Sequence, residues 1–186
     1  MKIFTGHTGT PHVTADIFRT LLIGIFGKET FIFPIWDMFD HELESNNSIL
    51  IKRGVMIHHG NISYTSEKTG DRLTITNGTQ GMKRIDLIVN RYKRDEMSGT
   101  ESNELVYIQG TPDAATAKEP EYSKGNVLDG ALIDDCPLYK VEINGLNVSN
   151  ITKLVKVRNG CQTPITAGVS APSGGEDGDV YIQFES

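Results

Sequence analysis

The side chains that could bind a metal ion or carry out acid–base chemistry are few and scattered in this sequence. Its five histidines are His7, His12, His41, His58 and His59. No two of them stand four residues apart, which is the helical spacing of a zinc-protease site. Adjacent residues of a β-strand point to opposite faces, so His58 and His59 in a strand would not easily share an ion. We therefore predict no metal site.

The acidic residues form two groupings that invite a hydrolase or calcium interpretation. One is Asp134–Asp135, and the other comprises Asp37, Asp40, Glu42 and Glu44. The second grouping lacks the central glycine and terminal glutamate of a calcium loop. Neither grouping supplies the paired acid and base that a polysaccharide-degrading enzyme needs. We interpret both as solvated turn residues.

Nucleophilic catalysis has no positive support. No serine lies in a glycine-flanked nucleophile elbow. The two cysteines, Cys136 and Cys161, lack the neighbouring cysteine that structural zinc sites use. We interpret both as ordinary thiols, and a disulfide between them is the less favoured state in a reducing compartment. These features predict a protein that is not an enzyme and uses no cofactor.

Length, composition and charge limit the remaining classes. The chain has 186 residues, of which 38% are hydrophobic and 23% charged, which suits one buried domain with extended ends. A net charge of -6 and a pI of 5.3 disfavour nucleic acid as a partner, because phosphate backbones attract Lys and Arg. No run approaches the roughly 18 apolar residues of a membrane span. Residues 1–6 lack the apolar block of a signal peptide, which predicts synthesis in a cytoplasm.

The first element that these residues predict is one short amphipathic helix. Thr14 is its expected N-cap, because the hydroxyl can accept a hydrogen bond from a free first-turn amide. Gly24 or Gly27 is the expected stop. Apolar residues at helical spacing share one face: Val13, Ile17, Phe18, Leu21, Leu22 and Ile25.

After this helix the pattern changes to short β-type runs separated by turn residues. The longest run is apolar on both faces, which predicts a central strand that forms a hairpin with the next run. The predicted fold is mostly β: an antiparallel sandwich or barrel-like domain with one short N-terminal α-helix and extended terminal segments. The runs lie at 49–52, 55–58, 62–65, 72–76, 84–93, 104–109, 138–143, 151–157 and 180–184.

We divide the chain into three parts. Residues 1–30 form an N-terminal arm and the short helix, and residues 31–158 form the β domain. Residues 159–186 form a flexible connector, rich in Gly, Ser, Pro and Thr, and a terminal strand that needs somewhere to dock. Within the β domain, 110–135 is expected to be a long irregular loop, and loops of this length are commonly functional or packed on a partner.

Several stretches resemble a family of phage tail proteins. At the start of the chain they are Met1–Thr14, the helix that follows and Gly24–Gly27. In the middle they are Asn77–Gly81 and Lys83–Tyr92, followed by Gly110–Pro112 and Pro120–Tyr122. At the end it is Gly178–Ile182, after the Gly-rich connector. Members of this family are baseplate or tail-fibre-attachment proteins of phages of Gram-positive bacteria and of related contractile bacteriocins. The shared motifs are structural, so the resemblance implies a particle rather than a reaction, and no catalytic residue carries over.

The helix departs from the pattern that we associate with this family. Ile17, Phe18, Leu21 and Leu22 stand where acidic or polar residues are expected. Exposed apolar area is unfavourable by roughly 25 cal/mol per Å². We therefore hypothesise that a partner subunit buries an apolar face of this helix.

The resemblance implies a virion structural protein of the tail tip, baseplate or tail-fibre base. Such a protein would be made in the bacterial cytoplasm, assemble as a homotrimer and with neighbouring tail proteins, and link the tail to host-recognition elements. Symmetric assembly and strand addition are the expected means. The expected assembly contacts are Phe4, His7, His12, Phe18, Leu22, Trp36, Tyr181 and Phe184.

An alternative is a carbohydrate-binding module that contacts the host cell wall directly. Aromatic rings serve as carbohydrate platforms, and Trp36, Tyr64 or Tyr92 could supply one. The dense aromatic group around Trp36 is more apolar than a plain surface loop, so it is either core or an interface. The group comprises Phe31, Phe33, Trp36 and Phe39.

Overall fold

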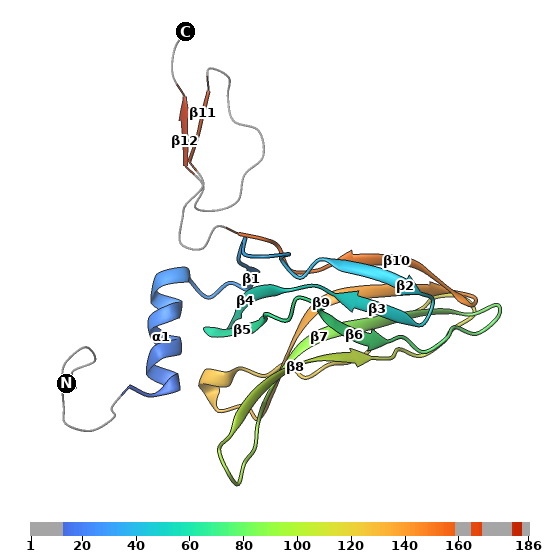
Figure 1. The fold of residues 1–186 in the computed structure, drawn as a ribbon, viewed down its shortest axis with the longest axis horizontal. Helices are drawn as coiled ribbons and strands as arrows, with labels where there is room; N and C mark the ends of the chain where they lie inside the picture. The colour runs from blue at the N-terminus through green and yellow to red at the C-terminus, as the bar shows by residue number, and fades with distance from the viewer. Residues whose placement is uncertain (1–12, 159–164, 169–179, 184–186) are drawn as a thin grey trace.

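The fold, taken from a computed structural model, is mostly β with one α-helix (Figure 1). The structure describes residues 13–158, 165–168 and 180–183. The predicted fold class is confirmed: antiparallel sheets pack face to face as in a β-sandwich, with the single helix at the start. In Figure 1 the helix stands at one end of the β body.

The helix α1 spans Ala15–Phe26, and local capping explains both of its ends. The Thr14 hydroxyl accepts a hydrogen bond from the Ile17 amide at 3.3 Å, as predicted. Gly27 stops the helix at a φ of 82°, a conformation that costs glycine little. Its amide donates to the Ile23 carbonyl at 2.8 Å. Gly24, the other candidate stop, lies inside the helix.

Three antiparallel sheets contain ten of the described strands. The sheet β10-β9-β7-β8 comprises Asn147–Lys153, Ile133–Asn144, Lys83–Arg94 and Glu101–Ile108. The sheet β1-β4-β5 comprises Phe31–Ile32, Gly54–His58 and Asn61–Thr65. The sheet β2-β3-β6 comprises His41–Ser45, Ser48–Ile51 and Asp71–Thr74. A separate pair, β11 (Ile165–Gly168) and β12 (Val180–Gln183), is parallel and lies apart from the body in Figure 1.

The strand β7 is central, as predicted, because it pairs with β8 on one side and β9 on the other. Its residues Leu87, Ile88 and Val89 are fully buried, so both of its faces are covered. The predicted hairpin between β7 and β8 is also confirmed. In its turn, the Asp95 amide donates to the Thr100 carbonyl at 2.9 Å.

One buried cluster joins the three antiparallel sheets. Tyr139 of β9 is fully buried in it and donates a hydrogen bond from its hydroxyl to the Phe39 carbonyl at 2.6 Å. Cys136 is also buried there, and burial raises the pKa of its thiol to about 12. The cluster includes Ile32, Ile49, Ile51, Met56, Ile75, Ile88, Leu138, Val141, Ile143 and Val155.

The loop predicted at 110–135 is shorter than expected and held at several points. Its last residues belong to β9, which begins at Ile133. Lys83 and Asp113 exchange backbone hydrogen bonds of 2.7 and 2.8 Å. The Ser123 amide donates to the buried Asp135 carboxylate at 2.9 Å, and a 3-10 helix, η1 (Val127–Asp129), follows. The loop therefore runs along the sheet and is tied to it.

Candidate functional site

Helix α1 docks on the β body through one side only. Leu22 is buried against Phe31 and Ile57. Arg19 is also buried, and its guanidinium binds both oxygens of Glu101 on β8. This hydrogen-bonded ion pair lowers the pKa of Glu101. The docking is close, because a Cβ on Gly60 would lie 2.7 Å from the Arg19 carbonyl oxygen.

The opposite side of α1, which we call the outer face, is apolar and exposed. Its side chains have between 40% and 48% of their surface accessible. Gly24 lies within this face by helical spacing and has no atom within 4 Å of where a Cβ would stand. A contiguous group of exposed apolar side chains commonly marks an interaction surface. The exposed apolar residues of this face are Ile17, Phe18, Leu21 and Ile25, and Val13, just before the N-cap Thr14, is also exposed.

The aromatic group near Trp36 divides between core and surface. Phe31 and Phe39 are buried, whereas Trp36 is 46% exposed. Trp36 has a φ of 57°, which is uncommon for a residue with a large side chain. The Arg53 guanidinium lies 6.0 Å from the centre of the Trp36 ring and binds Asp37 at 2.8 Å.

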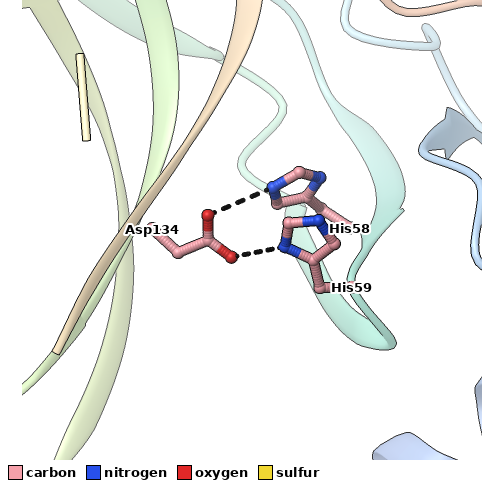
Figure 2. A group of neighbouring side chains, drawn as sticks. All are labelled: His58, His59 and Asp134. Carbon is pink, nitrogen blue, oxygen red and sulfur yellow. Dashed lines mark hydrogen bonds and ion pairs between the residues drawn. The ribbon is translucent and has the colours of Figure 1, made fainter. Parts of the chain in front are cut away.

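A histidine–aspartate cluster lies where the end of β4 meets the start of β9 (Figure 2). His58 Nε2 is 3.4 Å from Asp134 Oδ1, and His59 Nδ1 is 2.7 Å from Asp134 Oδ2. The two imidazole rings lie 3.9 Å apart with an interplanar angle of 34°. On the far side of its ring, His58 Nδ1 is 2.6 Å from the Thr30 hydroxyl.

The expectation that His58 and His59 point to opposite faces of a strand was wrong. β4 ends at His58, and His59 occupies the following turn with a φ of 48°. This left-handed conformation turns the His59 ring back beside the His58 ring. The turn between β4 and β5 is the residue pair His59–Gly60, since His58 pairs with Asn61. The sequence carried a signal for it, because glycine is favoured in a two-residue hairpin turn whose residues have a positive φ.

The interpretation of Asp134 and Asp135 as solvated turn residues was also wrong, since both are buried in β9. Asp86 is the third buried aspartate of the described residues, and Arg84 binds it at 2.8 Å. Arg91 binds Asp135 through two nitrogens, at 2.6 and 2.7 Å. Asp134 alone of the three faces histidines instead of an arginine.

Electrostatics keep Asp134 ionised. Burial by itself raises the pKa of this carboxyl group, but the hydrogen bonds from His58 and His59 outweigh it and lower the pKa overall. A buried carboxylate therefore lies against two imidazoles where β4 meets β9.

In the second acidic grouping, Glu42 and Glu44 lie exposed on β2 rather than in a turn.

The expected assembly contacts separate into three sets. Phe18 and Trp36 are exposed, whereas Leu22 faces the chain's own core and is not free for a partner. Tyr181 lies on β12. Phe4, His7, His12 and Phe184 lie outside the described residues.

The proposed carbohydrate platforms also differ from one another. Tyr64 is 68% exposed, but Tyr92 is buried and cannot present its ring to a glycan. Arg19 lies over the Tyr92 ring at 5.5 Å.

Comparisons with known proteins found no matching family model, no matching curated protein and no matching solved structure. Among the described residues, no helix is long and apolar enough to cross a membrane.

Proposed function

We propose that this protein is a non-catalytic structural subunit of a phage tail, in the tail tip, baseplate or tail-fibre base. It assembles as a homotrimer through the outer face of α1, contacts neighbouring tail proteins and links the tail to host-recognition elements. The single observation that carries the assembly part of this proposal is the exposed apolar outer face. The particle is supported by the resemblance of the stretches around Lys83–Tyr92 and Gly110–Pro112 to phage tail proteins.

The outer face has the pattern of a helix-packing surface. Ile17, Leu21 and Ile25 stand four residues apart, and rows at this spacing form the ridges that fit between the ridges of another helix. Gly24 beside this row leaves a gap in which a second backbone can approach. A copy of the same helix offers the matching ridge and gap, which favours symmetric self-assembly.

The terminal strands supply a second attachment point. Among the described residues, β11 and β12 pair only with each other. A two-stranded sheet by itself is marginally stable in water. Strand addition to a neighbouring subunit would complete this sheet, since exposed edges pair readily with another chain.

The oligomeric state of the purified chain tests the proposal. We expect light scattering after gel filtration to give a trimer for the wild type and a folded monomer for the double variant Ile17→Glu/Leu21→Glu, because buried carboxylates oppose packing. Met97→Glu is the matched control, since Met97 is 98% exposed in the β7–β8 turn and lies outside the outer face. A monomeric wild type, or a trimer that persists in the double variant, contradicts the proposal.

Deleting residues 163–186 distinguishes the role of the outer face from that of the terminal strands. If the outer face forms the trimer and the terminal strands contact a neighbour, the truncated chain remains a trimer. It then loses binding to the adjacent tail protein in a pull-down. A truncated chain that still binds its neighbour argues against strand addition.

A second candidate function is direct binding of host-wall carbohydrate, and the exposed Trp36 beside Arg53 and Asp37 favours it. An aromatic ring next to charged hydrogen-bonding groups is a common way to hold a sugar. Trp36→Ala should then abolish binding on a glycan array, while Tyr64→Ala retains it. Glycan binding unchanged in Trp36→Ala excludes this ring as the platform.

A further inference from the structure

We propose that His58, His59 and Asp134 form a binding site for a divalent first-row transition metal, with Zn²⁺ as the ion used to test it. The site is independent of the assembly proposed above. It rests on the placement of three ligand atoms, on the hydrogen bond behind one of them, and on the charge that surrounds them.

The geometry brings three suitable atoms to one point. His58 Nε2, His59 Nδ1 and an Asp134 carboxylate oxygen all lie within 4.8 Å of one another. Zinc binds nitrogen and oxygen at about 2.0–2.2 Å, so neighbouring ligands of a tetrahedral ion stand roughly 3.3 Å apart. The 3.4 Å between His58 Nε2 and Asp134 Oδ1 is close to that spacing. Figure 2 shows both rings directing a nitrogen at the carboxylate.

A hydrogen bond orients the first ligand from behind. His58 Nδ1 lies 2.6 Å from the Thr30 hydroxyl. In the tautomer whose Nδ1 donates its proton to that oxygen, Nε2 has a lone pair that can bind a metal ion. Metal-bound histidines almost always have such a partner on the other ring nitrogen. Without an ion, the other tautomer donates from Nε2 to Asp134 and accepts at Nδ1 from the Thr30 hydroxyl, so metal binding requires only that this proton moves to Nδ1.

The surrounding charges distinguish this carboxylate from its neighbours. Asp86 and Asp135 each bind an arginine. Its guanidinium stays protonated and therefore always balances the charge of the carboxylate. Asp134 has imidazoles in that position. Two nitrogens and one carboxylate oxygen suit zinc, copper, nickel or cobalt, whereas calcium and magnesium prefer oxygen alone.

The site also has an open side. Asp134 is buried, but the His59 side chain is 32% exposed. Three protein ligands leave one position of a tetrahedral ion for water or for a group from another molecule. The ligands belong to opposite sheets of the sandwich, since His58 ends β4 and Asp134 lies in β9. A bound ion would therefore cross-link the two sheets beneath helix α1.

Titration of the untagged, chelator-treated chain with ZnCl₂ tests the site. Calorimetry should show one ion bound per chain, and the melting temperature should rise with the logarithm of the free zinc concentration, because the ion binds only the folded state. Co²⁺ should give the visible absorption of a tetrahedral ion. MgCl₂ should cause neither change.

Two variants make the assignment specific. His59→Ala should lose the zinc-dependent rise and the cobalt absorption, and the core should stay intact because His59 is partly exposed and does not belong to the core clusters. His41→Ala is the matched control, because His41 lies on β2, away from the cluster, and should keep both signals. If Asp134→Asn fails to fold, the His59→Ala result still decides the question. Absence of zinc binding by the wild type, or equal binding by His59→Ala, overturns the proposal.

Discussion

Asp86 shows how single residues hold this fold together. Its buried carboxylate accepts hydrogen bonds from the Arg84 guanidinium, the Tyr107 hydroxyl and the Gly110 amide, the last at 2.8 Å. A side chain at Gly110 would not fit, since its Cβ would lie 2.0 Å from the Ile85 carbonyl oxygen. These contacts join β7, β8 and the start of the long loop.

The Tyr107 hydroxyl should make stability depend on alkaline pH. Burial, followed by the hydrogen bond to the Asp86 carboxylate, raises the pKa of Tyr107 to about 12. A raised pKa in the folded state contributes stability below the ordinary value of about 10, and that stability is lost as the pH rises through about 12. We expect the free energy of unfolding in urea to fall less over this range in Tyr107→Phe than in the wild type.

Tyr64→Phe is the control for this measurement. Tyr64 is exposed, so removal of its hydroxyl group should leave the wild-type pH dependence unchanged. An equal alkaline loss of stability in Tyr107→Phe and wild type would show that Tyr107 does not cause it.

At the residue scale, the sequence predicted little of the candidate site. Asp134 and Asp135 lie side by side in an apolar strand, and only their distant partners, His58 and Arg91, make burial tolerable. Those partners are 76 and 44 residues away, so local pattern could not identify them. By contrast, the Thr14 N-cap depends on residues within one helical turn, and it was predicted correctly.

Among the elements, helix α1 is packed against the β body on one side and exposes apolar side chains on the other. Its packed side touches the β4–β5 turn, where Gly60 has a φ of 75°. The same turn carries His59, so the position of the helix and the shape of the cluster are coupled.

Comparing Gly60→Ala with Gly99→Ala should distinguish the stability cost of close packing from the cost of backbone strain. Gly60→Ala should cost about 1–3 kcal/mol of unfolding free energy, because its Cβ meets the helix and its φ is strained. Gly99→Ala has a similar φ of 69° with no atom within 4 Å, so it should cost only about 1 kcal/mol. Urea unfolding of both variants measures the difference. Equal costs would mean that the helix moves freely to accommodate the new methyl group.

The strands show where sequence patterns were sufficient. β3 to β8 lie within three residues of the predicted runs, because each has branched or aromatic residues between turn signals. β9 begins five residues before its predicted run, and β10 begins and ends four residues before its own. β2 was missed because His41–Ser45 is almost wholly polar, with Leu43 its one apolar residue. It pairs with β3 at the edge of its sheet, where burial is not required. β1 was missed because it has only two residues, and β11 because it lies within the Gly-rich connector.

Over the whole molecule, one core spans all three antiparallel sheets, so the β body should unfold in a single step. Trp36 is the only tryptophan, and its loop leads to Phe39, whose carbonyl accepts the Tyr139 hydroxyl. We expect its fluorescence and the far-ultraviolet circular dichroism to change at the same urea concentration. A fluorescence change at clearly lower urea would mean that the loop and its sheet unfold as a separate unit.

The anchoring of the long loop has a consequence for how this protein can diversify. Asp113 is tied to Lys83, and Ser123 is tied to Asp135, while the residues between these anchors form no helix and no named strand. Each doubling of such an interval costs only about 0.6 kcal/mol of closure entropy. We therefore expect insertions at 114–122, whether by evolution or by the graft of an epitope, to disturb the sandwich less than insertions within its strands.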